Sequence, residues 1–499
     1  MAFVSCHEKY DNPNHNLTED AFAELRHDEY YVSSDEIRNE IDRIIGREGI
    51  ALSMDKHAHN YYKDKKRLMW ISKAGVEDRA DTLLRYLKEA SEFGLDTKMF
   101  RTEQIESDIE CVRNLDVLGD NAQDLNVVMA RLEYNLTKAY FRYSSGMNFG
   151  FVNPDYLFNS LEEYSVDSVT TKFRQLCDLR VKRADNKFYS SIIAKAFNDS
   201  VGDFLRASRP KGTLHEELVK RLAINSLTDS QRLKTICNLE RCRWRLKTHS
   251  DYESYKKYVI VNIPSYTLKA VDGKEILNMR IGVGAVSTKT PLLSSDIMRM
   301  DLNPQWIIPK NIAKGMVHSY NYMHRMGMFI LDKKLGKLPP EKASYEKIMN
   351  REQFIIQAGG PKNSLGRIIF RFDNNFSVFL HDTSTPWMLQ RSRRAISHGC
   401  VRVEKPLDLA LFMLEENDSQ LVERITYSMT VKLVNEKDSL KNSNIDKKKL
   451  INSVKIKPSV PVFITYYTVF PDSEGIMREY GDVYGYDKAM IEELSPFVK

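Results

Sequence analysis

Apolar residues recur at helical spacing through the first half of the chain and at strand spacing through the second half. Ser33 and Glu36 have the spacing of a helix capping box, and four isoleucines then share one face as far as Gly46. The same spacing returns further along and predicts helices over 78–93, 122–143, 216–223 and 232–246. We therefore interpret residues 26–250 as an all-α scaffold domain.

The period changes after Tyr255, where apolar residues alternate or run together as they do in strands. Residues 258–263 predict a buried strand, and Asp272-Gly273 joins two further strands as a hairpin. Later segments add predicted strands over 306–309, 368–372, 460–467 and 477–483, and a helix over 406–414. The fold class is therefore α+β, with a β-rich domain over 251–499. Residues 310–355 are long for a loop and predict an inserted lid or small helical cap.

Composition narrows the function classes. The chain has 499 residues, 42% of them hydrophobic, which is enough for more than one core. Its net charge of +6 is spread out, and the absence of a basic stripe interleaved with aromatic residues argues against a nucleic-acid module. The six cysteines form no CxxC pair and no zinc-type spacing with histidine, so we predict neither a metal nor a cofactor.

The first 25 residues fit two interpretations. One is an ordinary flexible terminus, because the segment is largely polar. The other is a truncated lipoprotein signal, since an apolar start and a small residue precede Cys6. In the second case Cys6 would carry a lipid and tether the protein outside the cytoplasm.

One motif carries the chemistry: Ser397-His398-Gly399-Cys400-Val401-Arg402, preceded by His381 at the end of apolar residues 377–380. Cysteine attacks as a thiolate, so it needs a neighbouring base, and His381 is the candidate. Gly399 permits a tight turn that aims the N–H groups of Gly399 and Cys400 at an oxyanion. The alternative is a buried cysteine beside two core histidines.

Two neighbouring residues complete the candidate chemistry. The backbone carbonyl of Asp382 is placed to fix the tautomer of His381. Arg402 lies two positions after the nucleophile and so points the same way along an extended strand. Its guanidinium matches a carboxylate of a substrate, although an internal salt bridge is the alternative.

This motif resembles the signature of the L,D-transpeptidases that crosslink peptidoglycan. The resemblance lies in the order of its residues: His381, then Ser397-His398-Gly399-Cys400, a hydrophobic residue and Arg402. Residues 239–244, 303–306 and 360–366 are similar to stretches of the large Gram-negative branch of this family, which also carries a helical scaffold. Larger relatives insert a peptidoglycan-binding module. The span 150–240 is short for both the scaffold helices and that module.

The resemblance implies acyl transfer between stem peptides. Cys400 would attack the carbonyl after the third residue of a donor tetrapeptide, expel a terminal D-alanine and pass the thioester to an amine of a second stem. It also implies acylation by carbapenems and a periplasmic location in the cell envelope. The implied catalytic residues are Cys400, His381, His398 and Gly399, and the implied substrate-binding residues are Arg402, Ser397, Trp306, Tyr320, Gly360 and Asn363.

Three other functions were weighed against this one. Water could take the thioester, which would make the protein an L,D-carboxypeptidase. A non-catalytic cell-wall binding or scaffolding protein could keep the fold alone, although intact His381, Cys400 and Arg402 argue against it. A papain-like protease is disfavoured because the base precedes the cysteine and lies in a β-rich context.

Overall fold

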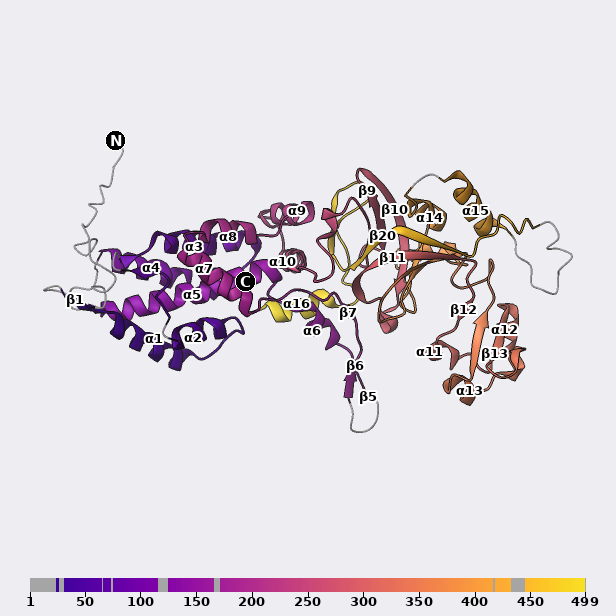
Figure 1. Cartoon of the computed structure of the whole chain (residues 1–499), viewed down its shortest axis with the longest axis horizontal. Coiled ribbons are helices and arrows are strands. Elements are labelled where there is room, and N and C mark those ends of the chain that lie inside the picture. The colour runs from indigo at the N-terminus through magenta and orange to yellow at the C-terminus, as the bar shows by residue number, and fades with distance from the viewer. Residues whose placement is uncertain are drawn as a thin grey trace. The chain divides into compact units, whose positions relative to one another are not determined.

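The structure is a computed structural model that describes residues 24–26, 31–64, 66–72, 75–114, 124–165, 171–415, 418–431 and 445–498 (Figure 1). Cys6 and the predicted lipoprotein signal around it lie outside the described residues. The chain forms two compact units. The helical unit takes the described parts of Met1–Asn153, Val181–Arg245 and Asp487–Lys499, and the sheet unit takes those of Pro154–Arg180 and Leu246–Tyr486.

This division differs from the predicted boundary at residue 250 in two segments. Pro154–Arg180 belongs to the sheet unit, because its strand β7 (Cys177–Asp178) pairs in parallel with β11 (Leu292–Leu302). Asp487–Lys499 belongs to the helical unit, where the buried carboxylate of Asp487 lies 2.5 Å from the guanidinium of Arg241. Neither long-range contact leaves a local trace in the sequence.

The helical unit is built around α5 (Leu125–Phe149), whose residues are buried on nearly every side. A helix that is enclosed in this way shows little amphipathic pattern, and the predicted end at residue 143 was accordingly too early. The helices that pack against α5 are α1 (Ser34–Glu48), α2 (Asp55–Lys63), α3 (Asp78–Glu89), α4 (Thr102–Asn114), α8 (Val201–Ser208) and α10 (Asp229–Arg243). The unit also contains α7 (Asn186–Phe197), α9 (Thr213–Leu222) and most of α16 (Tyr486–Leu494).

Local signals placed the start of α1 correctly. The hydroxyl of Ser33 accepts the backbone N–H of Glu36 at 3.4 Å, as the capping box predicts. The helix passes through Gly46 and ends at Gly49, which has a φ of 66°. Two short hairpins accompany the helices of this unit: β1 (Glu24–Arg26) with β2 (Tyr31–Ser33), and β3 (Ile71–Ser72) with β4 (Gly75–Val76).

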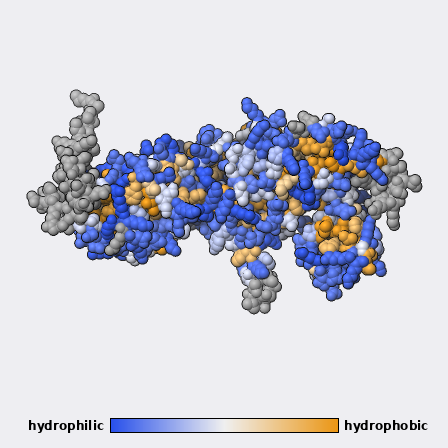
Figure 2. Space-filling view, viewed as in Figure 1, coloured by the Kyte–Doolittle hydropathy of each residue, from blue (hydrophilic) through white to orange (hydrophobic). Residues whose placement is uncertain are grey.

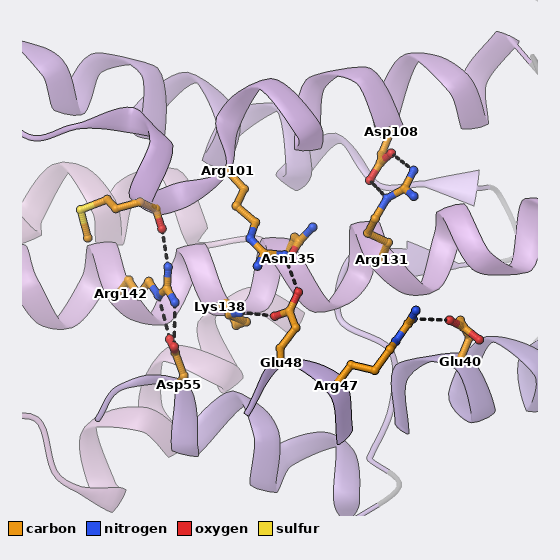
Figure 3. A network of polar contacts seen from close by, with 11 residues as sticks. Glu40, Arg47, Glu48, Asp55, Arg101, Asp108, Arg131, Asn135, Lys138 and Arg142 are labelled. Atoms are coloured by element: carbon orange, nitrogen blue, oxygen red, sulfur yellow. Dashed lines mark hydrogen bonds and ion pairs between the residues drawn. The ribbon is translucent and has the colours of Figure 1, made fainter. Parts of the chain in front are cut away.

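Charged side chains of α5 are paired inside the helical unit (Figure 3). Arg142 donates to both carboxylate oxygens of Asp55, at 2.7 and 2.6 Å, and both side chains are buried. Lys138 lies 2.7 Å from Glu48, and Arg131 forms a similar fork with another acid of the unit, Asp108. An enclosed helix can keep such cations because each has an anionic partner.

The sheet unit contains a sheet that closes on itself. Its strands follow the order β16-β17-β19-β10-β9-β8-β20-β11, and an additional pairing of β11 with β16 completes the ring. The bounds are β8 (Lys257–Asn262), β9 (Thr267–Asp272), β10 (Glu275–Gly284), β16 (Ile368–Phe372), β17 (Leu380–His381), β19 (Val401–Val403) and β20 (Ser453–Thr465). Strand β18 (Ala395–Ser397) pairs with β10 beside this ring. The predicted Asp-Gly hairpin is confirmed as β9–β10.

The predicted insertion at 310–355 is an α/β subdomain, so a purely helical cap was wrong. Its antiparallel sheet consists of β12 (Trp306–Ile307), β15 (Gln353–Gln357), β13 (Met328–Asp332) and β14 (Gly336–Leu338). Short helices α11 (Lys310–Ala313), α12 (Tyr320–Arg325) and α13 (Tyr345–Met349) accompany it around a separate apolar core. We call residues 306–357 the cap subdomain. Figure 2 shows hydrophobic residues on its visible face, and its exposed apolar residues include Ile307, Leu331 and Leu335.

The remaining elements of the sheet unit are short. They are α6 (Pro154–Asn159), β5 (Glu163–Ser165), β6 (Thr171–Phe173), α14 (Pro406–Phe412), α15 (Ser419–Thr430), β21 (Val469–Pro471) and β22 (Met477–Glu479). Of the apolar residues 377–380 only Leu380 lies in a strand, the two-residue β17, and Ser377 turns the chain before it with a φ of 56°. Among the described residues, no helix combines the length and apolar character that a membrane span requires.

The buried pair in Figure 3 gives a stability prediction. Asp55→Asn removes the negative charge but keeps the shape, so Arg142 becomes an uncompensated buried cation. We expect the unfolding free energy of the helical unit to fall by about 3 kcal/mol in urea titrations followed by circular dichroism. The control is Asp203→Asn, which breaks an exposed pair with Arg206. Equal stability of the two variants would contradict a structural role for the buried pair.

Candidate active site

Cys400 lies in a tight turn between β18 and β19, two strands that flank the same strand β10. Gly399 makes the turn with a φ of 120°, a backbone conformation that side-chain-bearing residues rarely adopt. The hydroxyl of Ser397 accepts the N–H of Gly399 at 3.1 Å and donates to the carbonyl of Cys400. The cysteine is therefore held by a hydrogen-bonded turn.

This turn is hydrogen-bonded to the connection between β10 and β11. The Thr290 hydroxyl accepts the N–H of Gly284 at 2.8 Å and donates to the Gly399 carbonyl at 2.8 Å. The Thr288 hydroxyl donates to the Ser397 carbonyl at 2.8 Å. A Cβ atom on Gly284 would lie 2.1 Å from the Thr288 carbonyl oxygen, so this close approach requires glycine.

Tyr484 supports the same connection from the C-terminal part of the sheet unit. Its hydroxyl donates to the carbonyl of Gly284 at 2.7 Å and accepts the N–H of Thr290 at 3.1 Å. The sequence analysis missed Thr288, Thr290 and Tyr484. Each acts through residues far away along the chain, so no local pattern could reveal them.

His381 is placed beside the cysteine turn by strand pairing. Strand β17 pairs in parallel with β19, with His381 opposite Arg402 and Leu380 opposite Val401. Side chains alternate along a strand, so buried Leu380 and Val401 point to one face and His381 and Arg402 to the other. Cys400 lies in the turn just before β19, two residues before Arg402. The charge of Arg402 lowers the pKa of both the Cys400 thiol and the His381 ring, so Arg402 lies close to both.

The backbone carbonyl of Asp382 accepts a hydrogen bond from Nδ1 of His381, as the sequence predicted. Because a carbonyl can only accept, Nδ1 carries the proton and Nε2 of the neutral ring has the free lone pair. Burial lowers the pKa of His381 to about 4, and the charge of Arg402 also lowers it, while the carbonyls of Asp382 and Leu365 act in the opposite direction. The ring is therefore a neutral base at neutral pH.

The Cys400 thiol is half-buried, and its sulfur lies 3.9 Å from the carbonyl of Ser377. Burial raises the pKa of the thiol, against the opposing effects of a Phe379 backbone hydrogen bond and of Arg402. Within the described part of the chain, no hydrogen bond joins the sulfur to His381. The resting site thus contains a neutral thiol and a neutral imidazole, and the pairing of the two in catalysis stays a prediction.

Arg402 brings an uncompensated positive charge to this site. Its Nη1 lies 3.8 Å from the sulfur of Met388, and its buried Nε has no hydrogen-bond partner. Among the described residues it forms no ion pair, and burial lowers the pKa of its guanidinium. The internal salt bridge that was the alternative is not observed, and the guanidinium remains available to an anion.

The two predicted oxyanion donors differ in their surroundings. The N–H of Gly399 already donates to Ser397, whereas the N–H of Cys400 has no acceptor in the segments that the structure describes. His398, the other predicted catalytic residue, is exposed. The backbone of Cys400 is thus the better candidate for stabilising negative charge.

The remaining predicted substrate residues lie in or next to the cap subdomain. Trp306 starts β12 and packs on the cap core, and Tyr320 starts α12. Asn363 is buried, and its amide donates to the carbonyls of Pro304 and Ala358 at 3.0 and 2.9 Å. Gly360 turns the same loop with a φ of 127°. Asn363 and Gly360 therefore shape the loop that leads from the cap subdomain back to β16.

The described residues contain neither a disulfide nor a cluster of three metal-ligating side chains. Cys111, Cys177, Cys237, Cys242 and Cys400 are all free thiols. No group of three or more His, Cys, Asp or Glu side chains in these ranges is arranged to hold a metal ion.

The support beneath the cysteine turn can be tested with Thr290→Val. This change keeps the volume but leaves the buried N–H of Gly284 and the carbonyl of Gly399 without their partner. We expect urea unfolding of the sheet unit to show a loss of about 2 kcal/mol, and alkylation of Cys400 by iodoacetamide to become faster. Thr430→Val, at an exposed position of α15, serves as the control. Unchanged values for Thr290→Val would show that the turn holds without this support.

Buried histidine predicts a pH dependence of stability. The pKa of His381 is about 4 in the folded chain and about 6.5 in the unfolded chain, so the unfolded state binds the proton more tightly. Stability should therefore fall as pH decreases from about 6.5 to about 4, by about 3 kcal/mol from this group. Calorimetry of His381→Gln should show a flatter pH profile for the sheet unit.

The helical unit offers a matched comparison. Burial, with Arg243 and Arg209 nearby, lowers the pKa of His215 to about 4 as well. His215→Gln should flatten the pH profile of the helical unit and leave that of the sheet unit unchanged. An identical sheet-unit profile for wild type and His381→Gln would contradict the neutral buried state of His381.

Comparisons with known proteins identify two domain types in this chain. Residues 256–425 match the model of the YkuD L,D-transpeptidase catalytic domain, and residues 56–222 match that of the Scaffold domain. A relative from Haemophilus influenzae, named "Putative L,D-transpeptidase", is 26% identical over 315 residues, which are 62% of this chain and 60% of the relative. The match thus spans less than two thirds of that relative's length.

A solved structure of an L,D-transpeptidase from Mycobacterium smegmatis is 13% identical and covers 42% of this chain and 58% of its own. Its TM-score of 0.19 is too low to support any conclusion. The YkuD match falls in the sheet unit, and the Scaffold match falls in the helical unit apart from the segment near 154–180. The chain therefore contains a Scaffold domain followed by an L,D-transpeptidase catalytic domain of the YkuD type.

Proposed function

We propose that this protein crosslinks peptidoglycan stem peptides through a thioester on Cys400. The observation that supports the proposal is the pairing of β17 with β19, which puts His381 opposite Arg402, two residues after Cys400. The cysteine turn, a neutral imidazole and an unpaired guanidinium are thereby brought to neighbouring strand ends. These are a nucleophile, a base and a carboxylate-binding group, which acyl transfer from a peptide requires.

In the first half-reaction, Nε2 of His381 takes the thiol proton as the Cys400 sulfur bonds to the carbonyl carbon of the donor tetrapeptide. Proton removal during attack suits a resting site in which both groups are neutral. The N–H of Cys400 donates to the developing oxyanion. The peptide C–N bond then breaks, and His381 returns the proton to the departing amine. The terminal D-alanine is released, and the rest of the donor stem stays bound to Cys400 as a thioester.

In the second half-reaction an amine of another stem peptide attacks the thioester. His381 accepts the proton from that amine, the new amide forms, and the sulfur leaves and recovers the proton. Throughout, the guanidinium of Arg402 binds a stem carboxylate, because it is the unpaired cation of this site. Attack by water on the same thioester would instead give L,D-carboxypeptidase activity.

The proposed substrate implies where the protein acts and which class of inhibitor reacts with it. Peptidoglycan lies outside the cytoplasmic membrane, so we propose that the protein acts in the periplasmic part of the cell envelope. A carbapenem would acylate the same sulfur by ring opening. A lipid on Cys6 would serve as the anchor for such a location and remains a prediction of the sequence.

Product analysis tests the proposal. Purified full-length protein is incubated with tetrapeptide muropeptides, and the products are weighed by mass spectrometry. We expect crosslinked dimers and free D-alanine from wild type and none from Cys400→Ala, because the nucleophile is missing. Tripeptides without dimers would replace crosslinking by carboxypeptidase activity, and unchanged tetrapeptides would support a non-catalytic wall-binding protein.

Intact-mass measurement after carbapenem treatment identifies the nucleophile separately. We expect one adduct on wild type and on Cys111→Ala, a control that removes a half-buried cysteine of the helical unit. Cys400→Ala should stay unmodified. An adduct on Cys400→Ala would reject this cysteine as the nucleophile.

A further inference from the structure

The helical unit contains a pocket that the proposed chemistry does not use. Its volume is about 170 Å³, and it opens to solvent. One water molecule needs roughly 15 Å³ of such space, so the pocket has room for a small organic molecule. The residues that line it include Ser53, His57, Ser145, Arg183 and Tyr189.

Arg183 presents unused hydrogen-bond donors to this pocket. Its Nη1 donates to the carbonyls of Phe149 and Gly150, both at 3.3 Å, and to that of Val152 at 3.2 Å. Its Nε and Nη2 have no partner among the described residues. They form the other edge of the planar guanidinium, whose geometry matches the two oxygens of a carboxylate.

A structural role explains one edge of this guanidinium only. Phe149 ends helix α5, and a cation at a helix C-terminus caps the last carbonyl groups. The bonds from Nη1 serve that purpose fully. Capping requires nothing of Nε and Nη2, the other edge of this pocket-lining guanidinium.

The carboxylates near Arg183 are already taken by other cations. Glu240 lies 3.1 Å from the guanidinium of Arg243 and accepts the N–H of Val152 at 2.8 Å. Asp55 is held by the fork of Arg142 (Figure 3). Burial lowers the pKa of Arg183, as expected for a cation that lacks a close anion. The pocket is therefore positively charged and contains no anion of its own.

The lining also contains a neutral aromatic pair. The rings of His57 and Tyr189 stack with centroids 3.7 Å apart. Burial and the charge of Lys56 lower the pKa of His57, so its ring is uncharged at neutral pH. The hydroxyl of Ser53 and the single N–H of the neutral His57 ring add further donors. Aromatic rings and a guanidinium in one pocket suit a small carboxylate with a short organic group.

We propose that this pocket binds a small organic carboxylate, with Arg183 donating two parallel hydrogen bonds from Nε and Nη2. The ligand is either a free organic acid or the carboxyl end of a peptide, since both present the same group. The site belongs to the helical unit, so it gives the Scaffold domain a ligand-binding role that is separate from Cys400.

Calorimetric titration tests the site with N-acetylglycine and with its neutral counterpart N-acetylglycinamide. The full chain carries Arg402→Gln, so that the other unpaired guanidinium does not contribute. We expect the acid to bind about tenfold more tightly than the amide, because only the acid forms the charged pair. If N-acetyl-Ala-Ala-Ala binds more tightly than N-acetylglycine, the ligand is the carboxyl end of a peptide. If it binds equally or more weakly, the ligand is a free organic acid.

Three variants locate the binding. Arg183→Gln should lose the preference for the acid, whereas Lys182→Gln removes an exposed neighbouring charge and should leave it unchanged. Ser53→Trp closes the rim without touching Arg183, and it should abolish binding even if Arg183→Gln fails to fold. Equal affinity for acid and amide, or wild-type binding by folded Arg183→Gln or Ser53→Trp, would overturn the proposal. Catalysis by Cys400 does not enter any of these measurements, so their failure would leave the proposed function intact.

Discussion

The parallel pairing of two very short strands, β17 and β19, is the constraint on which the catalytic face depends. The pairing puts His381 directly opposite Arg402 and fixes the face to which both point. A shift by one residue would exchange this face for the apolar one that carries Leu380 and Val401. Strands of two and three residues cannot hold such a register alone. The ring of strands around them, closed by β11 and β16, supplies the missing rigidity.

The protonation states of the site residues follow from this placement. The Cys400 thiol, the His381 imidazole and the Arg402 guanidinium are partly or fully buried, and the protein provides none of them with an opposite charge within the described ranges. Burial therefore favours the neutral forms of His381 and Cys400, while Arg402 stays charged. Without a ligand, the only charge in this site is that of Arg402. A ligand or transition state that brings a negative charge compensates this cation, so the site is complementary to an anion.

Local signals predicted much of the fold. The cap of α1, the Asp-Gly hairpin and the change from helical to strand period were confirmed, because each depends on residues close together in the sequence. Of the sheet in the cap subdomain only β12 was predicted, since the other strands have three to five residues and alternate weakly. Thr290 and Tyr484 were missed because they join residues 109 and 194 positions apart. The motif at Cys400 could be found, whereas its supports are visible only in three dimensions.

The interleaving of the two units affects how the chain is made. During synthesis from the N-terminus, the helical unit emerges first but stays incomplete, because Asp487–Lys499 belongs to it. The carboxylate that pairs with Arg241 leaves the ribosome only after the whole sheet unit has been translated. The helical unit therefore cannot complete its folding until the sheet unit has been synthesised. In the meantime the nascent helical unit remains incompletely folded.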